Sequence, residues 1–540
     1  MIRRGFAMIV MLLVVTERSL SAAPGYGEPL DKTTGTIYRV GTATALINAV
    51  DTMNAAGVPA TILISNGTYV LDVWALPVTC NHVIIRGASG QRDAVILRGP
   101  DEGESASLEH VFWVTASDVL IADLTFGWCR YHGIQNHGQE PYNASGLWVH
   151  NCRIVNCNEQ FIKGTSETSD PEGVTDGIIE NCLFEFTNRW AYQYYTGGID
   201  IHKGVNWTVR DNLFRDIRAT DGMAEHAIHF WNRCATRPQN VVAERNIIIN
   251  CDRGIGFGLS SYAGGHNGGS SVIRNNTVYN NGLAPNADVG IGLEYACNVQ
   301  VDNNTVYVPY WAPVEYRFSG SSNLVFRNNL VQGNITARDG APAPSLSNNV
   351  ASVQPGWFRG LTNGDLHVLP GATNAIDRGV TIAGFGDDLD GHTRPALSAW
   401  DIGADEYDPA RTDSDSDLML DAWEVGYKLN PTNAADATLD PDDDTFSNVE
   451  EYMAGTNPTN ASSFFQWLEV SRSLFSNDWK ILKWPGASGR VYAISTTTNI
   501  MSVGFTAITS GLAATSAMNI WTDQTSRGSA LYYQLRVTLP

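Results

Sequence analysis

Leu147-Trp148-Val149-His150-Asn151-Cys152-Arg153-Ile154 is the stretch that decides the fold, because its pattern returns along the middle of the chain. In each copy apolar residues alternate with other residues, and an Asn or Cys follows at a turn. These anchor residues are Cys152, Cys182, Asn212, Asn246, Asn276, Asn304 and Asn329, and the steps between them are 30, 30, 34, 30, 28 and 25 residues. A repeat of this length with period-two alternation predicts a solenoid of stacked strands, since one coil cannot bury its own apolar face.

The same phrase predicts which side chains face the core. The inward column is Val149, Ile179, Val209, Ala243, Ile273, Val301 and Phe326, and the outward column is His150, Glu180, Arg210, Glu244, Arg274, Asp302 and Arg327. We expect the anchor residues to stack like on like. Buried Asn amides would then bond the coils above and below and satisfy polar groups that a turn leaves without partners.

Composition narrows the class of protein. The 540 residues exceed one ordinary core, so the chain is expected to be an elongated repeat domain or several domains. Lys and Arg total 35 against 56 Asp and Glu, a net charge of −21, which argues against a nucleic-acid binder. An acidic polymer could still bind, but only at a local cationic cleft or through a bridging metal ion.

The start of the chain predicts export. Arg3 and Arg4 precede a short apolar run, and Ser21-Ala22-Ala23 offers a cleavage site, so residues 1–23 are interpreted as a signal peptide of a secreted or cell-surface protein. No later segment is long enough to span a bilayer. The eight cysteines form no CxxC metal pattern, and Cys152 and Cys182 are interpreted as stacked free thiols.

Three parts are expected after the signal peptide. Residues 24–408 are predicted to be a parallel β-helix, with a helix over 42–56, a strand over 60–65 and an Asn66–Tyr69 turn covering one end. Coils run to about Asn349, and residues 375–408 are expected to close the far end. Residues 409–461 form an acidic module, and 462–540 a small β-sandwich.

The acidic module contains two copies of a calcium-loop pattern. Positions 1, 3, 5, 9 and 12 are Asp413, Asp415, Asp417, Asp421 and Glu424 in the first copy, and Asp440, Asp442, Asp444, Asn448 and Glu451 in the second. Calcium takes six to eight hard oxygen ligands, and this spacing wraps them around one ion. Position 6, usually Gly, is Leu418 and Thr445. The alternative is a solvated acidic linker. The paired loops resemble thrombospondin type 3 and dockerin-type repeats, which implies structural calcium.

Another strand of each coil carries candidate chemistry. Its inward residues are Ile134, Ile162, Ile199, Ile228, Ile255 and Ile291. The first outward column is Gln135, Lys163, Asp200, His229, Gly256 and Gly292, and the second is His137, Thr165, His202, Trp231, Gly258 and Glu294. Because adjacent coils are about 4.8 Å apart, we expect the ionisable residues of these columns to lie together.

An aromatic insertion, residues 188–197, is expected beside these columns, and it contains Trp190, Tyr192, Tyr194 and Tyr195. Rings next to polar groups suit sugars, whose C–H faces stack while their hydroxyls hydrogen-bond. The glycines at 256 and 258 would leave a bare floor for a chain-like ligand. The alternative to a ligand site is that these outward residues are polar only because they face water.

Residues 42–408 resemble the secreted right-handed parallel β-helix proteins, a fold shared by many polysaccharide lyases, some glycoside hydrolases and uronan epimerases. The residues behind the resemblance are the Asn66-Gly67-Thr68-Tyr69 cap, the seven Asn/Cys phrases and the closing DDLDGHTRP and DIGADEY segments. The resemblance implies a carbohydrate-active solenoid and leaves the reaction open.

A lyase acting on a uronic-acid polymer is the function that these residues favour. Elimination needs a base, a cation for the developing charge and an acid for the leaving oxygen. We expect His202 or Lys203 as base and His229 as acid, with Asp200 orienting a histidine or helping to hold calcium. The expected substrate-binding residues are Lys163, Gln135, His137, Trp231, Arg253, Arg189, Trp190 and Tyr195.

Two other functions stay open. A hydrolase would pair Asp200 with Glu225 or Glu294 across the scissile bond. A non-catalytic carbohydrate-binding adhesin would need no chemistry at all. In each case we expect a monomer that takes a polysaccharide.

Overall fold

A computed structural model describes residues 32–539 apart from gaps at 140–141, 143, 166–172, 188, 233–236, 262–264, 284, 352, 473–479, 498–504, 515–516 and 525–531. The chain divides into two compact units, one ending at Tyr407 and one beginning at Asp408. The predicted signal peptide, residues 1–23, lies outside the described residues.

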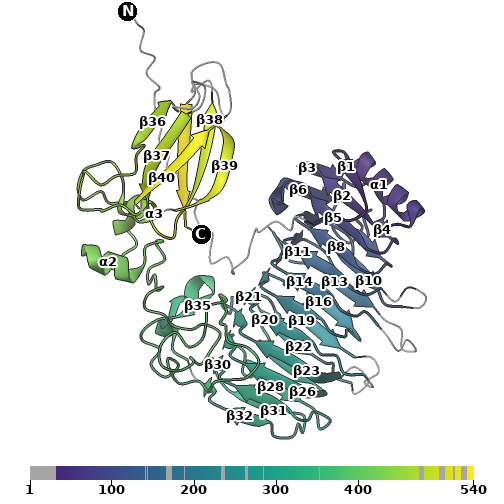
Figure 1. Ribbon diagram of the computed structural model, residues 1–540. Coiled ribbons are helices and arrows are strands. Elements are labelled where there is room, and N and C mark those ends of the chain that lie inside the picture. Colours follow the sequence, from purple (N-terminus) through teal and green to yellow (C-terminus); the bar gives the residue numbers. More distant parts are fainter. Residues whose placement is uncertain are drawn as a thin grey trace, which may run out of the picture. The chain divides into compact units, whose positions relative to one another are not determined.

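Three parallel sheets wind through the first unit, and each complete coil contributes a strand to each sheet (Figure 1). Sheet A contains β1 (Thr36–Val40), β2 (Ala60–Ile64), β5 (Val83–Gly87), β8 (Val119–Ala122), β11 (Trp148–His150), β14 (Ile178–Glu180), β17 (Thr208–Arg210), β20 (Val242–Glu244), β23 (His266–Arg274), β26 (Ala296–Asp302), β29 (Val325–Arg327) and β32 (Ser345–Ser347). Sheet B contains β3 (Gly67–Val70), β6 (Val95–Arg98), β9 (Thr125–Gly127), β12 (Arg153–Val155), β15 (Leu183–Glu185), β18 (Leu213–Arg215), β21 (Ile247–Ile249), β24 (Thr277–Tyr279), β27 (Thr305–Tyr307), β30 (Leu330–Val331) and β33 (Val350–Ala351). Sheet C contains β4 (Leu76–Val78), β7 (Phe112–Val114), β10 (Ile134–His137), β13 (Gln160–Thr165), β16 (Gly197–His202), β19 (His226–Trp231), β22 (Arg253–Phe257), β25 (Ile291–Glu294), β28 (Val314–Arg317) and β31 (Ile335–Arg338). The predicted solenoid is confirmed.

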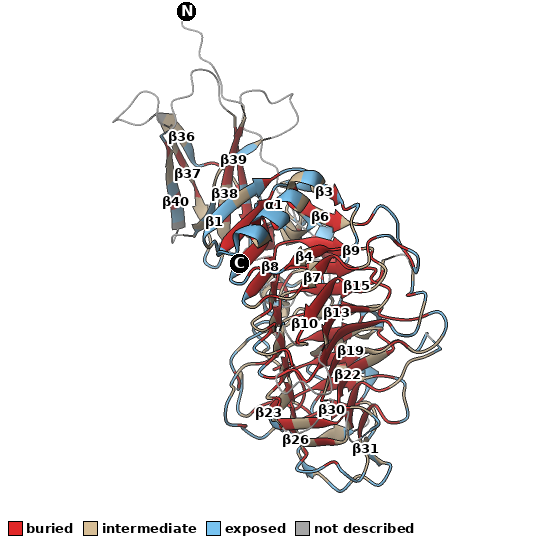
Figure 2. Ribbon diagram, turned by 90° about the vertical axis from the view of Figure 1, so that its right-hand side faces the viewer, coloured by how far each residue is buried: buried red, intermediate tan, exposed pale blue. Residues whose placement is uncertain are grey.

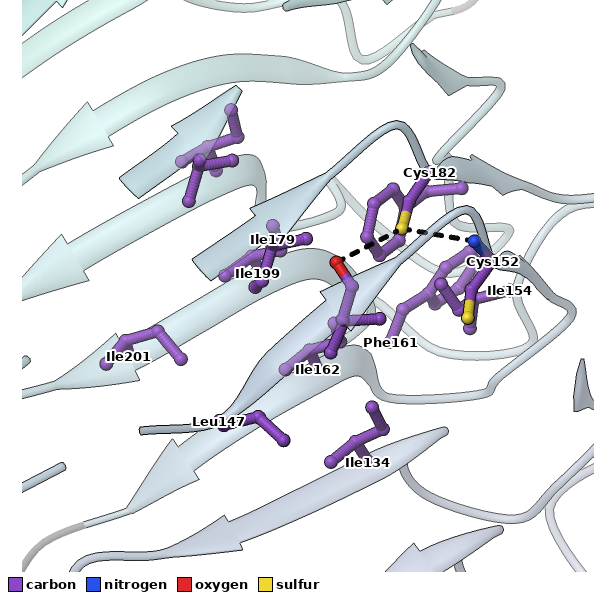
Figure 3. Packing of buried hydrophobic residues seen from close by; sticks show 14 of the residues in the cluster. Ile134, Leu147, Cys152, Ile154, Phe161, Ile162, Ile179, Cys182, Ile199 and Ile201 are labelled. Carbon is purple, nitrogen blue, oxygen red and sulfur yellow. Dashed lines mark hydrogen bonds between the residues drawn. The ribbon is translucent and has the colours of Figure 1, made fainter. Parts of the chain in front are cut away.

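The inward columns form one continuous core. All seven predicted inward residues of sheet A and all six isoleucines of sheet C have no exposed surface. Buried residues follow the stacked strands from coil to coil (Figure 2). Inside the coil the isoleucines pack against one another and against rings such as Phe161 (Figure 3). Phe184 stacks on Phe214 at 4.6 Å. The stacking therefore buries apolar surface that no single coil could cover.

The anchor residues form the expected ladder at the turn between sheets A and B. The side-chain amide of Asn212 donates to Asn246, that of Asn246 to Asn276 and that of Asn276 to Asn304, at 2.9–3.0 Å. The ladder continues through Asn329 to Asn349. At its other end the Cys152 amide donates to the Cys182 sulfur at 3.4 Å (Figure 3). The described cysteines, these two included, are free thiols.

Replacing Asn276 by Ala tests the ladder. Its Oδ1 accepts from the amide of Asn246 at 3.0 Å, and its Nδ2 donates to the Ala243 carbonyl at 2.9 Å. Each buried group left without a partner costs about 1–3 kcal/mol, so we expect a clear fall in Tm. Asn334→Ala, at an exposed position of the same β-helix, is the control and should change Tm little. Equal melting temperatures for the two variants would contradict a stabilising role for the ladder.

One end of the β-helix is covered as predicted by a helix, α1 (Ala43–Ala56). Thr42 caps its N-terminus by accepting from the Ala45 amide, and Gly57, with φ 61°, ends it. The prediction of a turn over Asn66–Tyr69 is wrong in part. Gly67 adopts φ 153°, and the residues after it continue as strand β3 in register with β6, because Tyr69 alternates into the core.

The far segment does not lie where the sequence suggested. After the 3₁₀ turn η3 (Pro355–Trp357), the hairpin β34 (Phe358–Gly360) and β35 (Asp365–Val368) with η4 (Leu361–Asn363) leads into residues 369–407. These residues pack along the outer side of sheet B instead of closing the last coil. Leu389 and Ala404 contact Ile247, and Asn303 donates to the Asp401 carbonyl. Packing of this segment against the outward apolar residues of sheet B is favourable, because those residues would otherwise face water.

The second unit combines short helices with two antiparallel sheets (Figure 1). The helices are α2 (Asp421–Tyr427) and α3 (Asn448–Ala454), with η5 (Asp436–Thr438) between them. One sheet holds β36 (Glu469–Arg472), β37 (Lys480–Gly486) and β40 (Ala517–Asp523), and the other holds β38 (Val491–Thr497), β39 (Thr506–Ala513) and β41 (Tyr532–Thr538). Trp484, Tyr492 and Leu535 form a shared core, which fits the predicted sandwich.

Candidate functional site

The register of sheet C brings the predicted columns together. Lys163 pairs with Asp200, and Asp200 pairs with His229 on the next strand. In the second column His202 pairs with Trp231. The expected register is therefore confirmed. These four ionisable residues are at least nine-tenths buried, although they project from the outer side of the sheet.

Asp200 is the centre of the cluster. Its carboxylate forms an ion pair with the Lys163 ammonium and accepts a hydrogen bond from Trp231 Nε1 at 2.9 Å. His202 Nε2 lies 3.4 Å from one carboxylate oxygen and His229 Nδ1 lies 3.5 Å from the other. We call Lys163, Asp200, His202, His229 and Trp231 the Asp200 cluster.

The charges of this cluster hold one another in place. Burial would raise the pKa of Asp200, but Lys163 and His202 outweigh burial and hold the pKa well below its usual range. Burial would likewise lower the pKa of Lys163, yet Asp200 and Tyr195 raise it. Asp200 thus stays a carboxylate and Lys163 stays an ammonium. Neither is suited to exchange a proton near neutral pH.

Tyr195 connects the Asp200 cluster to the protein surface. Its hydroxyl lies 3.0 Å from Lys163 Nζ, and the residue is 39% exposed. The other predicted members of the insertion lie elsewhere. Arg189 bonds to Asn158 Oδ1 and faces the Tyr192 ring at 4.4 Å, and Trp190 faces Arg218. Arg189 and Trp190 therefore border the turn between sheets B and C and do not join the cluster.

Two predicted catalytic residues have positions that do not suit the expected roles. Lys203 follows the last residue of β16 with φ 54°, so the alternation of the strand has ended there. Its amide donates to the Trp231 carbonyl. His229 is 2% exposed, and its Nε2 lies 2.9 Å from the Gly258 carbonyl, which pins the ring inside the sheet face. A positioning role suits His229 better than proton transfer to a substrate.

The expected bare floor at Gly256 is occupied. A Cβ at Gly256 would lie 2.6 Å from the His226 ring, so this glycine makes room for an imidazole that packs against the His229 ring at 4.6 Å. Burial, His229 and Arg253 lower the pKa of His226 well below its usual range. His226 was not among the predicted site residues. Alternation counted back from the inward Ile228 would place His226 inside the coil, but Ala227 and Ile228 both face the core, so the repeat pattern gave no signal for this histidine.

The remaining predicted binding residues are distributed along the same face. Arg253 forms ion pairs with Glu225 at 3.2 Å and Asp288 at 3.3 Å, on the far side of His226. Gln135 donates to the Thr165 hydroxyl at 3.1 Å, and His137 packs against the Trp113 ring at 4.0 Å. The predicted binding residues of sheet C thus form a face several coils long.

In the second unit the side-chain oxygens of each acidic loop gather around one point. Asp415, Asp417 and Glu424 carry buried carboxylate oxygens without a hydrogen-bond partner among the described residues, and Glu424 has no exposed surface. In the second loop the same holds for the carboxylates of Asp442, Asp444 and Glu451 and for the side-chain amide oxygen of Asn448. The first-position residues Asp413 and Asp440 accept amides of their own loops, which closes each loop into a ring. Buried oxygens without donors fit a hard cation such as calcium.

Asp421, a predicted calcium ligand of the first loop, makes other contacts. Both oxygens of Asp421 accept from Ser414, one from its amide and one from its hydroxyl, at 2.7 Å. Asp436 instead brings a buried, unpartnered oxygen toward Asp417 and Glu424. Asp436 lies outside the loop, so spacing within the loop could not reveal it.

Comparison with known proteins agrees with the geometry. A family model described as a right-handed beta helix region matches residues 106–351. The chain contains a right-handed parallel β-helix. No curated protein sequence matches the chain.

Several solved structures are similar to the β-helix at low identity. An alginate lyase from Paenibacillus sp. is 16% identical, with a TM-score of 0.36, over 58% of this chain and 99% of that one. The pectate lyase Pel9A is 14% identical, with a TM-score of 0.42, over 70% and 98%. The surface protein and adhesin PfbA of Streptococcus pneumoniae is 12% identical, with a TM-score of 0.31, over 58% and 94%. None of the helices in the described ranges is long and apolar enough to cross a bilayer.

Proposed function

We propose that the protein is a secreted, monomeric polysaccharide lyase that cleaves a uronic-acid polymer by β-elimination on the outer face of sheet C. The observation that supports this most is the Asp200 cluster with Tyr195 at its edge. It places a fixed ammonium, an oriented imidazole and a phenol hydroxyl around one carboxylate. These are the cation, base and acid that elimination requires.

His202 takes the proton α to the substrate carboxylate. The Asp200 oxygen, 3.4 Å from Nε2, stabilises the imidazolium that forms, and the Trp231 ring at 4.0 Å holds the imidazole in place. The electron pair left on carbon forms the double bond as the glycosidic C–O bond breaks. Tyr195 gives its proton to the departing oxygen. The Lys163 ammonium beside it stabilises the phenolate and the negative charge that develops on the substrate carboxylate.

A hydrolase is supported less well by the same contacts. It would need one protonated carboxyl and a second carboxylate across the bond. Asp200 stays ionised beside Lys163, while Glu225 is paired with Arg253 and Glu294 with Arg317. None of these three candidates is poised as a general acid.

Calcium belongs to the proposal as a structural ion of the second unit. Asp413, Asp415, Asp417, Glu424 and Asp436 would hold one ion, and Asp440, Asp442, Asp444, Asn448 and Glu451 the other. A bound ion would neutralise the carboxylates that otherwise repel one another. No step of the elimination depends on it.

An assay on alginate and polygalacturonate, reading ultraviolet absorbance and reducing ends together, tests the reaction. We expect new reducing ends accompanied by an absorbing unsaturated product. Reducing ends without absorbance would indicate hydrolysis, and binding without product would indicate an adhesin.

Tyr195→Phe and His202→Gln test the assigned roles. Loss of a positioned acid or base lowers kcat by about 10²–10⁴-fold, and we expect each variant to fall in that range while remaining folded. Tyr194→Phe is the matched control, since Tyr194 is 55% exposed in the same insertion and should keep full activity. Full turnover in both Tyr195→Phe and His202→Gln would refute the assignment.

A further inference from the structure

A group of aromatic and histidine rings, on sheet C and on the segments that lead into its strands, lies outside the Asp200 cluster. It contains Trp74, His110, Trp113, Tyr131 and His137, and we call it the ring platform. The Trp74 and Trp113 rings meet edge to face at 5.2 Å, and His110 packs against Trp113 at 5.1 Å. Tyr131 lies 5.5 Å from His110.

The platform is open on one side and polar beneath. Trp74 is 47% exposed, and Trp113 and Tyr131 are half-buried. His110 and His137 are more than nine-tenths buried, yet His110 Nδ1 and His137 Nε2 have no hydrogen-bond partner among the described residues. Buried polar atoms without partners cost free energy unless a ligand or water supplies the missing contact.

The platform stands in line with the proposed reaction centre. Trp113 pairs with Gln135 and Gln135 pairs with Lys163, so the three residues form one outward column. Two strand spacings, about 9.6 Å, separate Trp113 from Lys163. Gln135 lies between them with its amide on the Thr165 hydroxyl. A polymer lying across the strands would touch the three positions in turn.

We propose that the ring platform is a sugar-binding subsite, on the β7 side of the cleavage point, that takes a pyranose ring by stacking on Trp74 and Trp113. His110 and His137 hydrogen-bond the hydroxyls of that ring. This inference rests on the proposed function, since it assumes a polysaccharide laid along sheet C. It adds the direction in which the bound polysaccharide extends from the cleavage point. It also identifies a sugar unit that is recognised by stacking and hydrogen bonds instead of by charge.

The chemistry of the platform favours hydroxyls over carboxylates. Burial and the neighbouring His137 lower the pKa of His110 to about 4, and burial lowers that of His137. Both imidazoles are therefore neutral at pH 7 and can exchange hydrogen bonds with hydroxyls. Stacking on aromatic faces is little affected by salt, whereas attraction between Lys163 and a uronate weakens as salt rises.

The test measures binding of alginate and polygalacturonate to Trp113→Ala, Trp74→Ala and the wild type. The control is Trp148→Ala, a half-buried tryptophan on sheet A of the same β-helix. Loss of ring stacking should weaken binding by about tenfold in Trp113→Ala and Trp74→Ala and leave Trp148→Ala unchanged. The ratio to wild type should stay constant between about 0.05 M and about 0.5 M salt. Melting curves confirm that the variants are folded.

The outcomes separate this inference from the proposed reaction. Equal affinity of Trp113→Ala and Trp148→Ala, a loss that disappears at high salt, or a wild type that binds neither polymer would overturn the subsite. A wild type that binds through Trp113 but releases no unsaturated product would sink the lyase and leave the subsite standing. For an active enzyme, Trp113→Ala should raise KM with kcat nearly unchanged.

Discussion

Asp200→Asn should abolish turnover and destabilise the β-helix by about 3–5 kcal/mol, because it leaves the buried Lys163 ammonium without its carboxylate. It also removes the charge that stabilises a protonated His202. Thermal or denaturant unfolding measures the first effect, and the assay on acidic polysaccharides measures the second. Asp118→Asn is the control, since the Asp118–His82 pair is more than half exposed and should contribute under about 1 kcal/mol.

A second variant separates stability from chemistry. Lys163→Met combined with Asp200→Leu removes both charges and fills the site with apolar side chains. Replacement of a whole buried ion pair is often neutral or stabilising, so we expect stability to recover to within about 1–2 kcal/mol of wild type. Activity should stay absent, because the cation and the carboxylate that orients His202 are both gone. Recovered activity in this double variant would show that the Asp200 cluster is only structural.

Removal of calcium should selectively open the second unit. With calcium at about 100 times its Kd, binding to the folded state adds about 2.7 kcal/mol per site. A chelator should therefore expose protease sites within 409–461 of the full-length protein while the β-helix keeps its melting transition. Glu424→Gln and Glu451→Gln should reduce the effect of added calcium, and Glu104→Gln, at an exposed position of the β-helix, should not. A cleavage pattern unaffected by chelation would count against both loops.

The pH dependence has a definite sign. Burial and neighbouring acids raise the pKa of Glu424 to about 8, and those of Asp417 and Glu451 to about 7. A carboxyl whose pKa is raised in the folded state favours that state only at pH values at which it is protonated. Without calcium the second unit should thus be most stable below pH about 4 and lose stability as pH rises through 7 to 8. Calcium should reverse this trend, because it binds the ionised carboxylates and competes with protons.

The coil register and the catalytic columns could be predicted because they are local consequences of alternation. A strand places every second side chain on one face, and parallel coils stack those faces in step. Lys163, Asp200 and His229 therefore had to align once the isoleucines aligned. Lys203, the alternative base, could not be placed in this way, because the strand ends at His202 and a turn residue does not follow the alternation.

The amino-acid pattern alone thus specified the solenoid, its asparagine ladder and the neighbours of Asp200, since each depends on spacing within and between adjacent coils. Three features required the folded chain: residues 369–407 along sheet B, the His226 ring over Gly256, and Asp436 in place of Asp421 beside the first acidic loop. The first and the third join residues whose separation follows no repeat, and the second depends on a break in alternation, because Ala227 and Ile228 both face the core. Their contacts are set by which exposed apolar surface, open space or unpaired charge remains after the coils have stacked.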